Sequence, residues 1–266
     1  MYVTPELAAE YSAMAAAYSS LWAPVIRPMA LPLLEMLPLS QARDILDVGA
    51  GTGEFFQDLS RVAPDAHIVG VDRSEGMLRI AQARAAQPLA VMDAQRLAFR
   101  EAAFDLALCI FVLFHVPNPL EALREVRRVL RPGGHLGAVT WGEDDPGTPG
   151  AVIWREALDA AGARPDPRDP SIMQHSRMDS EAKLAGLLDE AGFTAVRTQR
   201  RFGEHRFTLD SLLTVQVRCG GASRRLPSLS PEARERCRAQ VEERLRRFSA
   251  EDLVYRAEVI FAVARK

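Results

Sequence analysis

The middle of the chain alternates short apolar runs with segments whose apolar residues recur every three or four positions. Continuous apolar runs are typical of parallel strands that are buried on both faces of a sheet. The three-to-four spacing is typical of amphipathic helices. The pattern therefore predicts strands at 45–48, 67–72, 89–92, 104–111 and 135–141, with helices at 54–62, 75–86 and 120–130 between them.

Capping residues mark the ends of these predicted helices. Ser74 is placed to cap the helix at 75–86, and Asn118 with Pro119 makes an N-cap and a first helical position for the helix at 120–130. Pro132-Gly133-Gly134 is expected to stop that helix before the fifth strand. Strands that alternate with helices in this order predict an α/β fold with a doubly wound parallel sheet.

The flanking regions add helices and two more strands. Residues 1–40 predict a helical cap with one apolar stripe, and residues 142–180 form a proline- and glycine-rich segment that we expect to act as a lid. We expect a helix at 180–191 and strands at 195–207 and 254–263, which make the sheet seven-stranded, Rossmann-like and mostly parallel. The predicted parts are a cap (1–40), a core (41–141), a lid (142–180) and a C-terminal part (181–266) with a helical insertion at 208–248.

Composition excludes few classes of protein. The formal net charge is -2, and 48% of the residues are hydrophobic, as in ordinary globular domains. Three cysteines far apart suggest neither a metal site nor a disulfide framework, and the N-terminus lacks the pattern of a secretory signal, so we expect a cytoplasmic protein. Residues 197–247 hold thirteen arginines and six acidic residues, which is typical of solvated helix faces and leaves an acidic or RNA partner as an alternative.

A glycine turn follows the first predicted strand and carries the strongest chemical signal. Gly49, Gly51 and Gly53 come between Asp47 and Glu54. In the dinucleotide fingerprint G-x-G-x-x-G the third glycine follows the second by three residues, and here Glu54 stands at that position. A carboxylate at a helix start repels a pyrophosphate. The turn therefore favours a ligand that carries positive charge and disfavours a nicotinamide-dependent oxidoreductase.

Six motifs in order then resemble one family. They are Leu-Asp-Val-Gly-Ala-Gly-Thr-Gly at 46–53, Val-Gly-Val-Asp at 69–72, Met-Asp-Ala at 92–94, Phe-Asp-Leu-Ala-Leu at 104–108, His-Val-Pro-Asn-Pro at 115–119 and Val-Leu-Arg-Pro-Gly-Gly at 129–134. The chain resembles the class I S-adenosylmethionine (SAM)-dependent methyltransferases, closely over 40–141 and loosely over 180–266. Within that class it is similar to the ubiquinone/menaquinone C-methyltransferases and to natural-product methyltransferases.

The resemblance implies a SAM site at the ends of the strands, with S-adenosylhomocysteine (SAH) as the product. Asp47 would lie near the ammonium group, Asp72 would accept hydrogen bonds from both ribose hydroxyls, and Asp93 would accept one from the adenine amino group. The other residues implied at this site are Gly49, Ala50, Gly51, Gly53, Arg73, Met77, Ala94, Cys109, Ile110 and His115.

Methyl transfer from a sulfonium depends mainly on positioning, and a base is needed only where the acceptor must lose a proton. Candidate bases are His115, His175 and His205, with Tyr11 and Tyr18 as positioning residues. The segment after the fourth strand lacks the Asn/Asp-Pro-Pro-aromatic pattern of enzymes that methylate amino groups, and no acid is placed for a catechol-type metal. We therefore expect metal-independent methylation of an oxygen or carbon.

The acceptor is predicted to be a small, partly apolar molecule, quinone-like or a secondary metabolite. We expect neither nucleic acid nor a membrane as partner, and a monomer or homodimer. The alternative from another class is a SAM-binding cyclase or scaffold that does not methylate. The sequence leaves open which molecule accepts the methyl group and which residue removes a proton.

Overall fold

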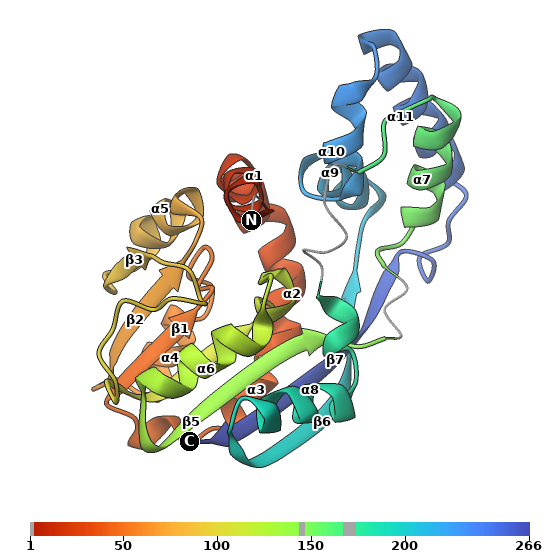
Figure 1. Cartoon of the computed structure of the whole chain (residues 1–266). Coiled ribbons are helices and arrows are strands. Elements are labelled where there is room, and N and C mark those ends of the chain that lie inside the picture. The colour runs from red at the N-terminus through yellow and green to blue at the C-terminus, as the bar shows by residue number, and fades with distance from the viewer. Residues whose placement is uncertain (1–2, 144–146, 167–173) are drawn as a thin grey trace.

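The computed structural model describes residues 3–143, 147–166 and 174–266. Seven strands form one sheet in the order β3-β2-β1-β4-β5-β7-β6, and β7 alone runs antiparallel to its two neighbours (Figure 1). The strands are β1 (Asp44–Val48), β2 (His67–Asp72), β3 (Leu89–Val91), β4 (Phe104–Ile110), β5 (Leu130–Trp141), β6 (Thr194–Arg206) and β7 (Val254–Arg265). The predicted α/β fold with a mostly parallel seven-stranded sheet is confirmed.

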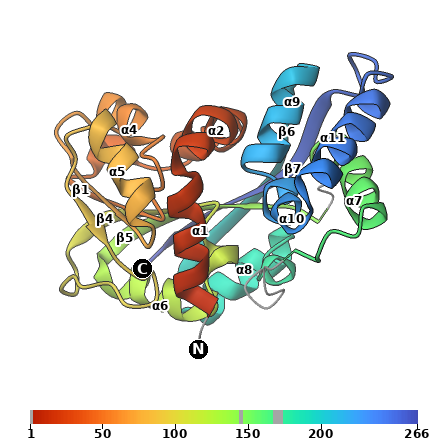
Figure 2. The ribbon, with the colours of Figure 1, turned by 90° about the horizontal axis from the view of Figure 1, so that it is seen from above.

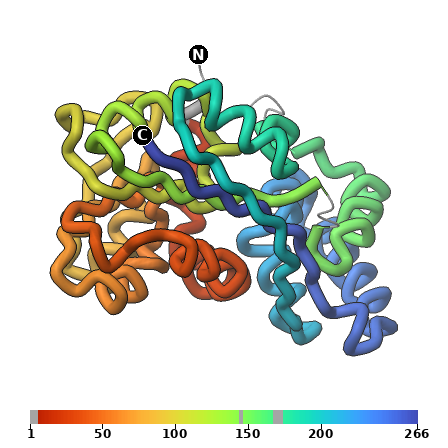
Figure 3. Tube along the Cα trace, turned by 90° about the horizontal axis from the view of Figure 1, so that it is seen from below, coloured from red at the N-terminus to blue at the C-terminus, as the bar shows by residue number. Residues whose placement is uncertain are grey.

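Helices cover both faces of this sheet. On one face α4 and α5 pack against β2, while α2 and α3 reach β6 and β5; on the other face α6 and α8 pack against β5 and β7 (Figure 3). The α-helices are α1 (Val3–Ala17), α2 (Ala23–Ala30), α3 (Pro32–Glu35), α4 (Phe56–Val62), α5 (Glu75–Arg84), α6 (Pro119–Val129), α7 (Ala151–Ala160), α8 (Glu181–Glu190), α9 (Leu209–Arg218), α10 (Gly221–Arg225) and α11 (Pro231–Leu245). Short 3-10 helices are η2 (Leu39–Gln41), η3 (Leu113–His115), η5 (His175–Arg177) and η6 (Leu226–Ser228), and η1 (Tyr18–Trp22) is a π-helix.

The predicted helix caps are present. The Ser74 hydroxyl accepts a hydrogen bond from the Met77 amide, and the Asn118 side chain accepts one from the Glu121 amide. Each cap satisfies one of the amides that the first turn of a helix leaves without an intrahelical partner. The order of elements from β1 to α6 therefore follows from local signals in the sequence.

The start of β5 differs from the prediction. Residues 132–134 do not separate helix from strand: α6 ends at Val129 and β5 begins at Leu130. The register with β4 shifts here, since Phe104 pairs with Leu130 and the next pair joins Leu106 to His135. The glycines absorb this bulge, with φ +78° at Gly133.

The C-terminal insertion stands at one end of the sheet. β6 and β7 continue past the other strands and carry α9, α10 and α11 between them, and α7 packs against α10 and α11 (Figure 1). Seen from above, α1 runs between α5 and these insertion helices (Figure 2). Parts of the predicted lid, 144–146 and 167–173, lie outside the described residues, so its closing function stays a prediction, as does the division into four parts. In the described ranges, none of the helices has the length and apolar character needed to cross a bilayer.

Candidate active site

A cavity of about 1170 Å³ opens where the carboxyl ends of β1, β2 and β4 face α1 and the insertion. Its volume exceeds the range of about 300–1,000 Å³ that is typical of pockets for one small ligand. A smaller pocket of about 40 Å³ adjoins it at the glycine turn, and Tyr18, Ile110 and Phe111 line both spaces. The geometry therefore offers room for two ligands side by side.

Each glycine of the turn has a positive φ angle: +77° at Gly49, +55° at Gly51 and +75° at Gly53. A Cβ atom on Gly49 would lie 2.4 Å from the Val112 side chain, whereas one on Gly51 would meet only the Gly49 oxygen, at 3.9 Å. Gly49 thus permits close packing below the turn, and Gly51 presents bare backbone to the cavity. Gly53 differs from the expectation: it faces the ring of Phe56, 2.8 Å from where its Cβ would be, and does not line the described cavity.

Two carboxylates lie at the strand ends beside this turn. Asp72 accepts hydrogen bonds from the amides of Gly51 at 2.9 Å and Ser74 at 2.8 Å, and burial still raises its pKa. Asp47 is 2% exposed, and its Oδ2 atom has no hydrogen-bond partner among the described residues. Burial, helped by the charge of Asp72, raises the pKa of Asp47 to about 7. A buried acceptor without a partner is costly, so a cationic donor would be favourable here.

Glu54 contributes less charge to the pocket than its sequence position suggests. Its carboxylate forms an ion pair with Arg84 and accepts a hydrogen bond from the Thr52 hydroxyl at 2.8 Å. The arginine compensates its charge. The negative potential beside the turn therefore comes from Asp47 and Asp72.

The end of β3 supplies the far side of the cavity. Asp93 forms an ion pair with Arg73 at 2.9 Å and accepts a hydrogen bond from the Gln95 amide at 2.9 Å. Both residues of this ion pair line the cavity, together with Met77 and Ala94. Met77 and Ala94 give this end of the cavity apolar surfaces, and Asp72 and Asp93 give it carboxylate acceptors.

Helix α1 closes over this end. The Ser12 hydroxyl lies 2.8 Å from the Ser74 hydroxyl and accepts a hydrogen bond from the Gly76 amide at 3.2 Å. A Cβ atom on Gly76 would lie 2.6 Å from the Ser12 Cα atom. The close approach of α1 to α5 thus depends on a glycine, and the sequence alone did not reveal the contact of Ser12 with the cap residue Ser74.

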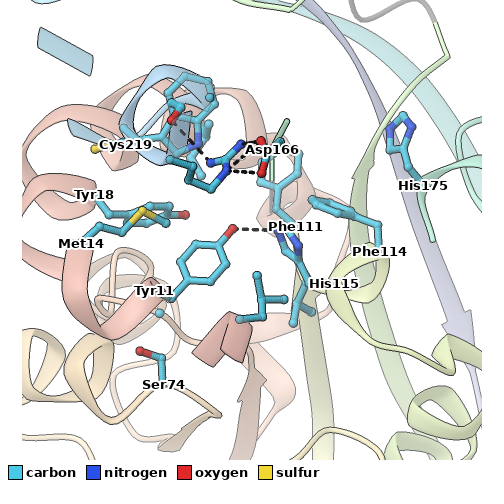
Figure 4. A pocket seen from close by; sticks show the side chains of 18 of the residues that line it. Tyr11, Met14, Tyr18, Ser74, Phe111, Phe114, His115, Asp166, His175 and Cys219 are labelled. Carbon is cyan, nitrogen blue, oxygen red and sulfur yellow. Dashed lines mark hydrogen bonds and ion pairs between the residues drawn. The ribbon is translucent and has the colours of Figure 1, made fainter. Parts of the chain in front are cut away.

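Tyr11 of α1 and His115 of η3 meet above the turn. The Tyr11 hydroxyl lies 3.0 Å from Nε2 of His115, and Figure 4 shows it pointing at the imidazole. Tyr18 packs edge-on against Tyr11, and burial raises its pKa well above the usual value. Tyr18 therefore stays protonated at neutral pH, which suits a hydrogen-bond donor and not a base.

The other predicted residues separate into two groups. His175 lines the cavity and packs edge-on against Phe114, which lies between it and His115 (Figure 4). His205 lies in β6 with its ring against Phe207 and does not line the described cavity, so its predicted catalytic role lacks geometric support. Cys109 is 0% exposed within β4 and likewise does not line it. Because β4 is buried on both faces and its side chains point alternately to the two faces, the Cys109 side chain lies in the hydrophobic core and not in the cavity.

The second half of the cavity is lined mainly by apolar and aromatic side chains from α1, η1, β5, α7 and α9. Examples are Met14, Trp22, Trp141, Trp154, Leu158 and Val215. The arginines of α10 are ion-paired: Arg224 lies 2.6 Å from Asp166 and 3.5 Å from Glu10, and Arg225 lies 2.5 Å from Asp159. The Arg-rich character of the insertion is thus partly compensated at the cavity wall.

Comparison with known proteins gives one family. The model of the methyltransferase domain family matches residues 46–138. A demethylmenaquinone methyltransferase of Listeria monocytogenes serotype 4a is 28% identical over 183 residues, covering 62% of this chain and 75% of that protein. The demethylmenaquinone methyltransferase of Lactococcus lactis subsp. lactis is 31% identical over 178 residues, which cover 60% of this chain and 69% of that protein. The crystal structure of the cyclase SpnF matches with a TM-score of 0.57 at 23% identity, over 93% of this chain and 84% of that chain, which is a likeness of fold alone.

Proposed function

Because the chain belongs to the class I SAM-dependent methyltransferases, we propose that it transfers a methyl group to an oxygen or carbon of a small, partly apolar, quinone-like molecule. The observation that carries this proposal is the continuous cavity of about 1170 Å³, polar at the glycine turn and aromatic beyond it. One end suits the cofactor and the other suits an acceptor.

The residues at the glycine turn fit SAM. Asp47 has a buried oxygen without a hydrogen-bond partner in the described part of the chain, as a site for an ammonium group requires. Gly51 leaves bare backbone facing the cavity. Asp72 would hold the ribose and Asp93 the adenine. When bound, the cofactor supplies an activated methyl group on a positively charged sulfur atom.

The aromatic half of the cavity supports a neutral, flat acceptor. Its wall is mostly apolar, and the arginines in it, Arg224 and Arg225, are held by carboxylates, which leaves them poorly suited to bind an anionic substrate. Known pockets of this kind bind through apolar area, with few polar groups fixing orientation. The quinone-type acceptor in the names of the relatives agrees with this surface.

Tyr11 and His115 provide a route for the acceptor's proton. With Nε2 of His115 unprotonated, the Tyr11 hydroxyl donates to it across 3.0 Å. The oxygen of Tyr11 then accepts a proton from an acceptor hydroxyl while its own proton moves to His115. Proton removal raises the nucleophilicity of the hydroxyl oxygen and of the ring carbon conjugated with it. His175, on the far side of Phe114, stays the second candidate base.

Incubation with methyl-labelled SAM tests the proposal. We expect label to appear on 2-polyprenyl-1,4-naphthoquinol, with one equivalent of SAH formed for each product molecule. Tandem mass spectrometry distinguishes an O-methyl from a C-methyl product. A rearranged product without label would favour a cyclase, and no product from quinols of several ring sizes would contradict the proposed acceptor class.

The raised pKa of Asp47 predicts a pH-dependent affinity for SAH. Below about pH 7 the ligand-free protein keeps a proton on this carboxyl group. A bound ammonium group favours the carboxylate, so binding releases that proton, and affinity should rise by up to about tenfold per pH unit until it levels off near pH 7. Calorimetry in buffers of different ionisation enthalpy measures both affinity and proton release.

Asp47→Asn provides the matched control for this titration. The amide cannot ionise, so its affinity should be weaker and independent of pH between about 5.5 and 7. An affinity of the wild-type protein that stays flat or falls over this range would contradict the placement of a cation beside Asp47.

A further inference from the structure

Phe111 has a backbone conformation that bulky residues rarely adopt. Its φ angle is +51°, in the left-handed region. Its amide still donates to the Val139 carbonyl at 2.9 Å, so the pairing with β5 continues to the residue at which the chain turns into η3. Glycine would make this turn without strain. Strained backbone conformations of this kind cluster at functional sites, so the conformation of Phe111 beside the cavity suggests that its ring has a function there.

The ring lies at the boundary between the two parts of the site. Phe111 lines the small pocket together with Asp47, and it lines the large cavity together with Tyr11 and His115 (Figure 4). It is 9% exposed. Its side chain therefore borders both the space for the methionine end of the cofactor and the space for the acceptor.

Other aromatic residues hold this ring in place. Trp141 stacks on Phe111 with ring centroids 4.1 Å apart and an angle of 21° between the planes. The ring of Tyr255 lies beside both tryptophans: its centroid is 6.4 Å from that of Trp141 and 6.0 Å from that of Trp22. Trp22 ends the π-helix η1, a rare irregularity that often occurs at functional sites. Phe111, Trp141 and Trp22 all line the cavity and form what we term the aromatic wall.

We propose that Phe111 is a specificity-determining residue, whose ring gives a planar acceptor a face to stack on and so sets the acceptor's position beside the methionine pocket. The inference rests on the proposed function, because it takes the large cavity as the acceptor site. Stacked aromatic pairs gain free energy beyond their buried area. A saturated molecule with the same skeleton lacks the flat face and gains only from burial.

Two probes separate these contributions. 1-Naphthol and decahydro-1-naphthol share one carbon skeleton and one hydroxyl, and only the first is planar. Calorimetry with the full chain and saturating SAH is expected to give a preference of about three- to tenfold for 1-naphthol. Phe111→Leu should reduce this preference below about twofold while its affinity for decahydro-1-naphthol stays at the wild-type value, with SAH kept saturating for each variant.

Two further variants control the comparison. Phe111→Tyr keeps the ring and should keep the preference. Phe202→Leu removes an aromatic ring that is 66% exposed and outside the described cavity lining, and it should change neither probe's affinity. If Phe111→Leu does not fold, Trp141→Leu removes the other half of the stack and should show the same loss of preference.

An unchanged preference in Phe111→Leu would overturn the inference. An equal loss of affinity for both probes and for SAH would also overturn it, because that pattern indicates a structural role alone. The measurement needs no turnover. A protein that methylates no quinol but loses its planar preference in Phe111→Leu would refute the proposed function and leave the role of the aromatic wall supported.

Discussion

Replacing Asp72 by asparagine is expected to weaken the binding of SAH by about 100-fold. Both oxygens of this carboxylate accept backbone hydrogen bonds, from Gly51 at 2.9 Å and Ser74 at 2.8 Å. An amide group must turn its NH₂ toward one of those two donors, which loses an acceptor and disturbs the turn. Hydrogen bonds to charged groups contribute about 1.5–3 kcal/mol each, and the ribose hydroxyls would lose part of theirs too.

Thermal unfolding separates this effect from damage to the fold. At a SAH concentration about 100 times the wild-type Kd, ligand binding stabilises the wild-type protein by about 2.7 kcal/mol, and a 100-fold weaker variant by about 0.4 kcal/mol. Without ligand, Asp72→Asn should unfold near the wild-type temperature, because the lost hydrogen bond is offset by removal of a buried charge.

Asp44→Asn is the matched control. Asp44 is the first residue of β1, at the end of that strand opposite the glycine turn. It forms an ion pair with Arg131 at 2.9 Å and does not line the described cavity. Its SAH affinity should equal that of the wild type. An Asp72→Asn protein that binds SAH within about threefold of the wild type would leave the proposed ribose contact without support.

Much of the cavity's end at the glycine turn could be predicted because its residues are close together in the sequence. Asp47 and Asp72 each stand at the end of a short apolar run, and parallel strands bring their carboxyl ends to one edge of the sheet. The glycine offsets, together with the flanking acids Asp47 and Glu54, disfavoured a pyrophosphate. Ser74 could be predicted as a cap for the same reason, since a cap contacts amides only two or three residues away.

The remaining features depend on contacts between distant segments. Tyr11 and His115 are 104 positions apart, and the α1 stripe that carries Tyr11 indicated only that one helix face is buried. In the sequence Glu54 has no evident partner for its charge; in the structure the packing of α5 brings Arg84 to it. Phe111 looks like one more residue of an apolar strand, and its left-handed φ angle arises where the β5 ladder ends and η3 begins. Periodicity carries no information about such pairings.

His115→Ala is expected to lower kcat by about 10²–10⁴-fold, the usual contribution of a positioned acid or base. The variant removes the group that we propose takes the proton from Tyr11, so turnover should fall while SAH affinity stays near the wild-type value. Tyr11→Phe interrupts the same route at its first step and should also lower kcat. The double variant should be no slower than the slower single variant, because both changes remove one proton route.

The three histidines form a matched set for this experiment. His175→Ala tests the second candidate inside the cavity, and His205→Ala tests a histidine of β6 outside the described lining. We expect His205→Ala to keep full activity and His175→Ala to change KM more than kcat, because the ring of Phe114 separates it from Tyr11. Added imidazole should partly restore His115→Gly, since the cavity beside Tyr11 can admit the small base. A His115→Ala enzyme with wild-type kcat at saturating acceptor, together with a slow His175→Ala enzyme, would transfer the role of base to His175 and leave Tyr11–His115 as a bond that holds α1 over the cofactor.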